Sequence, residues 1–413
     1  MTASSSPGVP LGHSVSWALL GNVFYAICQW GAVVLLARMG SVELLGRFAL
    51  ALALTAPVFL LAGFQLRGIL ATDAREQFRF TDYVGLRLLA MLVSLVAVGL
   101  LAPRDSGDAF ATVAFIGLAK SFEGLSDVYY GQYQRLDRMD RVARSLAFRG
   151  AAGLLGISVG LRIAGTASAA AAGMALAWLA VLLLYDIGPT ALRAFARDAR
   201  AALRWSNASR ILALTRLSFP LGLVLMLVSL QSNIPRYFLD AFGGSKALGA
   251  FAALSSFVAV GIVMVGALGQ SASPMMARRF AGGEYPAFLR LVAGVSLAAF
   301  AVGVIGWIVS AAAGASLLGL LLGEQYRPYA HELTWLMAMG IVAYVASALG
   351  YALTAARQIR VQVPMLLVAC LTVAAVSYTL VPGHGILGAA WAVGAGFAVQ
   401  VLGSLGVLWK SAP

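Results

Sequence analysis

The sequence predicts an all-α protein that crosses a membrane many times. Of its 413 residues, 61% are hydrophobic and only 11% are charged, whereas soluble globular proteins carry about 25% charged residues. Long apolar runs recur along the whole chain, and each is close to the roughly 20 residues that a helix needs to span a bilayer. A soluble enzyme, a secreted disulfide scaffold and a disordered chain are therefore excluded.

Twelve apolar segments are long enough to span a membrane. In the first half of the chain we expect spans at 14–37, 43–65, 81–102, 109–131, 142–163 and 167–187. In the second half we expect spans at 212–236, 246–271, 285–311, 331–355, 361–381 and 385–409. The longest connections are then 188–211, 272–284 and 312–330. None of these is large enough for an extramembrane domain.

The basic residues predict the orientation of these spans. The net charge is +13, from 29 Lys and Arg against 16 Asp and Glu. Eighteen basic residues fall in the even-numbered connections and at the C-terminus, and six fall in the odd-numbered connections. Because basic loops stay cytoplasmic, we expect both termini in the cytoplasm. The excess of positive charge is thus a topology signal, and we expect no nucleic-acid partner.

The chain divides into two halves of six spans each. We expect an N-terminal lobe over 1–187, a basic cytoplasmic linker over 188–211 and a C-terminal lobe over 212–413. Residues 40–49 align with 243–252 at an offset of 203, and each stretch contains Leu-Gly, one residue, then Phe-Ala. Repeats of six spans have the same orientation, which is a plan that transporters use with substrate bound between the halves.

Charged residues inside the predicted spans are the first candidates for a functional site, because a charge near the bilayer centre costs about 2.5 kcal/mol or more. In the fourth span Lys120, Glu123 and Asp127 lie on one helical face, at positions i, i+3 and i+7. Arg149 lies at a depth similar to that of Glu123 in the next span, so we expect these two to pair. By the same argument Arg87 is expected to meet Asp127.

Two interpretations of these charges stay open. They are structural ion pairs that tie the first half together, or they line a water-filled cavity that holds a polar substrate. Five embedded cations face only Glu123 and Asp127, and this surplus favours an anionic ligand. The cations are Arg47, Arg87, Lys120, Arg149 and Arg216. The surplus is smaller if Arg47 and Arg216, near span ends, extend to the membrane surface.

Uncharged polar residues add to this candidate cavity. Asn22, Tyr25 and Gln29 form a stripe on the first span, which either faces the cavity or makes interhelical hydrogen bonds. Tyr129, Tyr130 and Gln134 extend the fourth-span set, and Arg236 lies at the outer end of the seventh span. Neither a P-loop nor an HExxH or GxSxG motif occurs, and the three histidines are scattered. We therefore expect that the protein is not an enzyme and that it binds neither a metal ion nor a cofactor.

The stretch 120–135, Lys-Ser-Phe-Glu-Gly-Leu-Ser-Asp-Val-Tyr-Tyr-Gly-Gln-Tyr-Gln-Arg, resembles the polysaccharide flippases of the Wzx type, which handle O-antigen and exopolysaccharide. Arg138-Met139, 145–150 and 36–48 extend the resemblance, which covers nearly the whole chain. These flippases belong to the MOP superfamily, together with the MATE exporters and the lipid II flippase. The resemblance implies a MATE-like fold, with two six-helix lobes around a V-shaped central cavity, in the bacterial inner membrane.

The same resemblance implies a function. Such proteins flip undecaprenyl-pyrophosphate-linked oligosaccharides from the cytoplasmic to the periplasmic leaflet by alternating access, for polysaccharide or lipopolysaccharide export. Membrane lipids and other polysaccharide assembly proteins are the further expected partners. The alternative is a MATE-like, ion-coupled exporter of small organic molecules. A cation exporter would favour an acidic cavity, whereas this one looks basic.

On this reading the candidate substrate-binding residues divide by chemistry. Glu123 and Asp127 orient the cations or carry a coupling proton. Arg216 and Arg236 are further candidate contacts. Diphosphate or acidic-sugar contact is assigned to Arg47, Lys120 and Arg149. Sugar contact or cavity lining is assigned to Asn22, Tyr25, Gln29, Tyr129, Tyr130 and Gln134.

Overall fold

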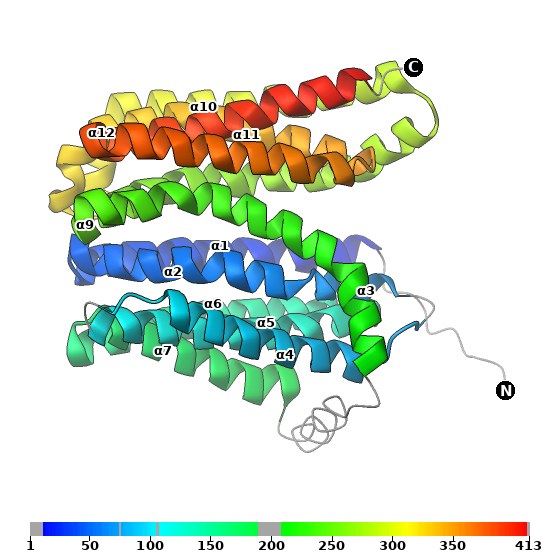
Figure 1. Ribbon diagram of the computed structural model, residues 1–413, viewed down its shortest axis with the longest axis horizontal. Helices are drawn as coiled ribbons and strands as arrows, with labels where there is room; N and C mark the ends of the chain where they lie inside the picture. The colour runs from blue at the N-terminus through cyan, green and yellow to red at the C-terminus, as the bar shows by residue number, and fades with distance from the viewer. Residues whose placement is uncertain (1–10, 74–75, 105–106, 189–207, 411–413) are drawn as a thin grey trace. The chain divides into compact units, whose positions relative to one another are not determined.

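In the computed structural model, the described residues are 11–73, 76–104, 107–188 and 208–410, and within these ranges all regular secondary structure is helical (Figure 1). Most of the predicted linker 188–211 lies outside them. The chain forms two compact units. The first is made of Met1–Ala32 with Leu54–Leu223, and the second of Val33–Ala53 with Val224–Pro413. The division into lobes at the linker stays a prediction.

The first two long helices contribute to both units. They are α1 (Leu11–Met39) and α2 (Val42–Gly63). The other helices of the first unit are α3 (Leu66–Thr72), α4 (Phe80–Leu101), α5 (Gly107–Arg135), α6 (Met139–Ala164) and α7 (Ala167–Val181). A π-helical turn, η1 (Leu182–Ile187), continues α7. Helix α5 packs against α4, α6 and α7, and this packing positions the candidate site.

Glycine lets α6 and α7 approach closely. A Cβ added to Gly156 would overlap the backbone carbonyl of Gly173, and a Cβ added to Gly173 would overlap that of Gly156. Lipid tails are as apolar as leucine, so helices in a membrane gain stability by close van der Waals contact between small residues. The first turn of α7 is fixed by Thr166, whose hydroxyl accepts a hydrogen bond from the Ala169 N–H at 3.2 Å.

The second unit is built mainly from four long elements. They are the part of α9 (Ala208–Ala281) after residue 223, α10 (Tyr285–Leu321), α11 (Ala330–Ala355) and α12 (Ile359–Lys410), with a 3₁₀ turn η3 (Glu324–Tyr329) before α11. Gly244 breaks α9 at φ 69° and Gly385 breaks α12 at φ 53°. Because positive φ suits glycine and few other residues, α9 and α12 are each two helices joined at a glycine.

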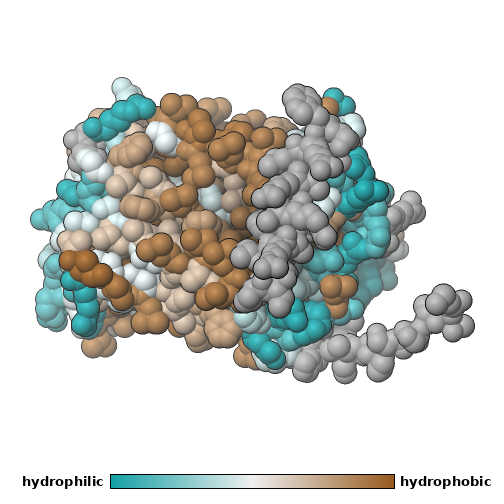
Figure 2. All heavy atoms as spheres, turned by 90° about the horizontal axis from the view of Figure 1, so that it is seen from below, coloured by the Kyte–Doolittle hydropathy of each residue, from teal (hydrophilic) through white to brown (hydrophobic). Residues whose placement is uncertain are grey.

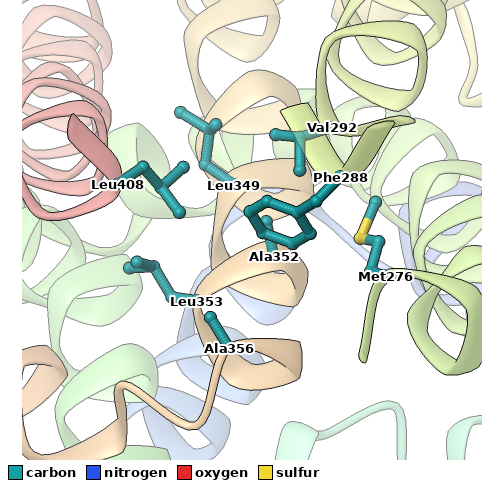
Figure 3. Close-up of a cluster of buried hydrophobic side chains, with 8 residues drawn as sticks. All are labelled: Met276, Phe288, Val292, Leu349, Ala352, Leu353, Ala356 and Leu408. Carbon is teal, nitrogen blue, oxygen red and sulfur yellow. The ribbon is translucent and has the colours of Figure 1, made fainter. Parts of the chain in front are cut away.

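A cluster of buried side chains holds α10, α11 and the C-terminal ends of α9 and α12 together. Figure 3 shows side chains from α9, α10, α11 and α12 that converge on Phe288. Phe288 and Met276 are fully buried. The cluster consists of Met276, Phe288, Val292, Leu349, Ala352, Leu353, Ala356 and Leu408.

The two segments that align in the sequence at an offset of 203 residues contact each other within the second unit. A Cβ on Gly46 would overlap the carbonyl oxygen of Ser245, and a Cβ on Gly249 would overlap that of Val42. Val42 and Ser245 are 203 residues apart, and so are Gly46 and Gly249. The contact is therefore reciprocal, as expected if the two segments occupy equivalent positions of a repeat.

Nine helical segments among the described residues have the length and composition to cross a membrane. On the face shown in Figure 2, hydrophobic side chains gather over the middle and hydrophilic side chains over the two ends. Two expected loops are wrong: most of 272–284 and of 312–330 is helical, because α9 extends to Ala281 and α10 extends to Leu321. The connections there are correspondingly short.

We predict that Gly156→Ala destabilises the protein although alanine favours helices. The helix propensity gain is about 0.5–1 kcal/mol, but the new methyl group meets the Gly173 backbone, and overpacking costs about 1–3 kcal/mol. The melting temperature of the purified variant in detergent should fall. Gly99→Ala on α4, where no atom lies within 4 Å of the new Cβ, is the control and should melt at or above the wild-type temperature.

Candidate functional site

The candidate site is centred on the Glu123 carboxylate of α5. Lys120, one helical turn away, places Nζ 2.8 Å from Glu123 Oε2. Arg149 of α6 places Nη2 3.5 Å from Oε1, so the predicted pair of Glu123 and Arg149 is confirmed. Tyr25 of α1 donates its hydroxyl hydrogen to Oε1 at 3.1 Å. One carboxylate thus serves two cations and one hydroxyl, and this trio of charges sums to +1.

Arg149 lies in an enclosure of aromatic rings. Its guanidinium carbon is 5.0 Å from the ring centre of Tyr25, 5.4 Å from that of Tyr130 and 5.5 Å from that of Trp178. These distances are typical of cation–π interactions. The side chain is 3% exposed, and its Nε and Nη1 atoms have no hydrogen-bond partner among the described residues. Aromatic faces rather than acceptors therefore surround most of this cation.

The space beside Arg149 is small. A cavity of about 20 Å³ is lined by residues of α1, α6 and α7, including Tyr25, Gln29, Arg149 and Trp178. This volume is enough for about one water molecule. In this arrangement the cavity cannot hold a sugar or a diphosphate, so a substrate at Arg149 requires the surrounding helices to move.

A second buried acid, Asp186, lies beneath this site and was missed by the sequence analysis. It is 1% exposed and sits in the π-helical turn η1. Ser126 of α5 and Ser145 of α6 each donate a hydrogen bond to its carboxylate at 2.5 Å. Residue 186 ends a predicted span next to a basic linker, so its position in the sequence is typical of a solvated span end. The π-helical turn, which places it in the interior, leaves no pattern in the sequence.

Asp186 changes the charge balance on which the anionic-ligand hypothesis depended. Around α5, the cations Arg87, Lys120 and Arg149 now face the carboxylates Glu123, Asp127 and Asp186, and a fourth cation, Arg67 of α3, lies 5.4 Å from the centre of the Tyr130 ring. With every group ionised, the surplus around α5 is one positive charge, which is smaller than the sequence suggested. The expected ion pair between Arg87 and Asp127 is also wrong, since these groups attract each other without approaching within 4.0 Å in the described structure. Arg87 is 5% exposed, and its Nε has no partner there.

The structure brings only some of the polar candidates to Glu123. Gln29 donates to the Tyr25 hydroxyl at 2.6 Å, and Tyr130 is fully buried beneath Arg149. Tyr129 instead packs on Phe80 and on an apolar cluster of α4, α5 and η1. Asn22 and Gln134 are exposed, and the Asn22 amide donates to the Ala18 carbonyl of its own helix.

The remaining candidate cations lie apart from this site. Arg47 is exposed on α2 and belongs to the second unit, whereas Lys120 and Arg149 belong to the first. Arg216 is exposed near the start of α9. Arg236 belongs to the second unit, where it donates to the Asn233 side chain at 3.1 Å and no carboxylate of the described residues lies within 4.0 Å. Neither unit by itself assembles the expected set of Arg47, Lys120 and Arg149.

The comparisons with known proteins cover nearly the whole chain. No family model matches. The chain is 22% identical over 377 residues to the capsular polysaccharide biosynthesis protein CapF of Staphylococcus aureus, covering 91% of this chain and 93% of CapF. An inward-facing MATE multidrug transporter of the MOP superfamily matches with a TM-score of 0.72 at 11% identity, over 96% of this chain and 100% of that one.

Two further solved structures agree. The lipid II flippase MurJ, in an inward closed conformation, matches with a TM-score of 0.73 at 12% identity, over 95% of this chain and 87% of that one. A MOP transporter of Pyrococcus furiosus matches with a TM-score of 0.60 at 11% identity, over 96% and 93% of the two chains. The chain has the fold of the MOP-superfamily transporters. It is thus an all-helical, multi-pass membrane protein, and its sequence is distantly similar to that of CapF.

We predict that Glu123→Gln destabilises this MOP-fold protein strongly. The change leaves Lys120 and Arg149 without their shared carboxylate, and loss of one partner of a buried ion pair costs about 3–5 kcal/mol. Thermal unfolding of the purified variant measures the effect. Glu324→Gln removes one partner of the exposed pair with Arg327 and should change stability by about 1 kcal/mol or less. Equal effects of the two changes would contradict the central place given to Glu123.

Proposed function

We propose that the chain flips undecaprenyl-pyrophosphate-linked oligosaccharide repeat units from the cytoplasmic to the periplasmic leaflet of a bacterial inner membrane. Transport proceeds by alternating access and serves polysaccharide or lipopolysaccharide export. The observation that carries the proposal is the similarity to CapF, a capsular polysaccharide biosynthesis protein, along nearly the full length of both chains. The fold, which the chain shares with the lipid II flippase MurJ, supports it.

The chemistry of the cargo explains why such a protein is needed. A diphosphate and a string of sugars lose their hydration in hydrocarbon, and unpaired polar groups cost several kcal/mol each there. Lys120 and Arg149 are the cations best placed to replace water around the diphosphate, because Glu123 balances only one of their two charges. The Tyr25 and Gln29 side chains beside them supply hydroxyl and amide groups for sugar.

The proposed topology has twelve crossings. Nine segments qualify by length and composition. Two of these, α9 and α12, count as two crossings each because Gly244 and Gly385 divide them, and α5 is the twelfth crossing. Helix α5, which carries Lys120, Glu123 and Asp127, is 29 residues long and therefore extends about 43 Å at 1.5 Å per residue. Lobes 1–187 and 212–413 then have six crossings each around a V-shaped central cavity, joined by the linker 188–211, with both termini in the cytoplasm.

A second candidate function is an ion-coupled exporter of small organic molecules, like the MATE transporters. Asp186 favours it, because this buried carboxylate lowers the positive surplus around α5 and so weakens the preference for an anionic cargo. The match to a MATE transporter, with a TM-score of 0.72, supports it equally. Expression in a host that lacks its own exporters separates the two: resistance to cationic dyes would support the exporter.

We predict that Lys120→Ala and Arg149→Ala each abolish surface glycan in a strain whose own gene is deleted. The reason is the loss of the cations that replace water around the diphosphate. Immunoblotting of the glycan, together with the amount of protein in the membrane, measures the effect. Arg327→Ala removes an exposed cation that pairs with Glu324 and serves as the matched control. Normal export by both Lys120→Ala and Arg149→Ala would overturn the assignment of these residues to the substrate.

A further inference from the structure

Asp186 stands out among the buried carboxylates because hydroxyl groups, not cations, surround it. Ser126 and Ser145 each donate to it at 2.5 Å, and no Lys, Arg or His of the described residues lies within 4.0 Å of its carboxylate. The Tyr133 hydroxyl donates to the backbone carbonyl of the same residue at 2.7 Å. Asp186 and both serines are at most 1% exposed. An unpaired ion in such a place is costly, and a neutral carboxylic acid is not.

The oxygen spacing fits a proton and does not fit a metal ion. Two oxygens that ligate one ion each lie at least about 2 Å from it and must themselves stay apart. Separations of 2.5 Å between serine and carboxyl oxygens are those of short O–H···O hydrogen bonds, and are closer than two oxygen ligands of one ion approach each other. The site is therefore built around hydrogen atoms shared between oxygens.

A chain of hydroxyl groups joins Asp186 to the candidate site. The Ser145 hydroxyl is 2.6 Å from the Tyr130 hydroxyl. The guanidinium carbon of Arg149 lies 5.4 Å from the centre of the Tyr130 ring, and Arg149 in turn contacts Glu123. All of these residues belong to the first unit. A change at Asp186 can thus reach Arg149 through two side chains.

We propose that Asp186 binds and releases one proton, and that Ser145 and Tyr130 transmit this change to Arg149. The inference rests on the proposed function only for its consequence, which is that proton binding at Asp186 biases the substrate site. The ligand is a single proton, which converts the carboxylate to a carboxylic acid and adds no other atom.

Counting hydrogen atoms shows how the signal passes. A serine hydroxyl has one hydrogen. When Asp186 is ionised, Ser145 donates that hydrogen to the carboxylate, and Tyr130 must donate to Ser145. When Asp186 takes up a proton and its new O–H donates to Ser145, the serine hydrogen is released from Asp186 and, in the proposed relay, turns toward Tyr130. The Tyr130 hydroxyl then accepts from Ser145 and turns its own hydrogen away beneath Arg149.

The titratable groups near Asp186 lie on α5, on α6 and next to Asp186 in the chain. Helix α5 contributes Asp127, a carboxylate like Asp186 itself, together with Tyr130 and Tyr133. Helix α6 contributes Arg149, which makes no ion pair with Asp186 among the described residues. Helix α4 meets η1 through Met91 in an apolar cluster, and Tyr185 precedes Asp186 in the chain. Among the described residues no cation lies within 4.0 Å of the Asp186 or Asp127 carboxylate, and Asp186 is the one of the two that accepts hydrogen bonds from two serine hydroxyls.

Infrared difference spectroscopy of the purified full-length chain in liposomes tests the proposal. Raising the pH should remove the carbonyl stretch of a protonated carboxyl group, and ¹³C-aspartate labelling should shift that band, which identifies aspartate without any mutation. Asp186→Asn should abolish the band. Asp137→Asn, at an exposed turn residue with φ 55° that suits asparagine, should keep it. A band that persists in Asp186→Asn, or that follows sodium concentration and not pH, overturns the proton site.

The relay has its own readout. With ring-deuterated tyrosine, the C–O band of a tyrosine should change in step with the aspartate band, and Tyr130→Phe should remove this change. Ser145→Ala should leave the aspartate band titrating while the tyrosine band stays constant. A tyrosine change that survives Ser145→Ala overturns the relay. Because these spectra need no glycan, they stand or fall separately from the flippase proposal, which is tested by export.

Discussion

Hydrocarbon does not solvate charge, so every charged group inside the bilayer must find its compensation within the protein. Around Glu123 this constraint fixes several helices at once. Its carboxylate holds Lys120 on its own helix, Arg149 on α6 and Tyr25 on α1. Arg149 is further surrounded by three aromatic rings from three helices. The same contacts that make the charges tolerable therefore also bring the candidate substrate groups together.

Much of the fold could be predicted from the sequence because membrane spans follow from composition alone. The apolar runs located the helices, and helical periodicity placed Lys120 and Glu123 on one face and Arg149 opposite them, as found. The expected loops at 272–284 and 312–330 were wrong because α9 and α10 continue beyond their apolar portions. Hydropathy reports where the hydrocarbon ends, whereas a helix ends where its hydrogen-bond ladder does.

The site was harder to predict because it depends on contacts between helices. Arg87 faces α5 and packs at Gly124, but its guanidinium does not come within 4.0 Å of the Asp127 carboxylate among the described residues, because a matching depth does not fix which atoms two side chains bring together. Trp178 carries no charge, and only the packing of α7 reveals that it faces both Lys120 and Arg149. Asp186 enters the interior through a π-helical turn, a local change of helical pitch that residue types do not encode in any simple pattern.

The reciprocal contact of Gly46 with Ser245 and of Gly249 with Val42 has an evolutionary consequence. Surfaces that pair position i with j and j with i are self-complementary, as at a two-fold dimer interface. A half-length ancestor carrying one copy of this segment would already have been able to bind its own twin through it. Fusion of two such genes would then have preserved an old subunit interface as a contact between two helices of one chain. Each glycine would still allow the close approach of a backbone segment that once belonged to the other subunit.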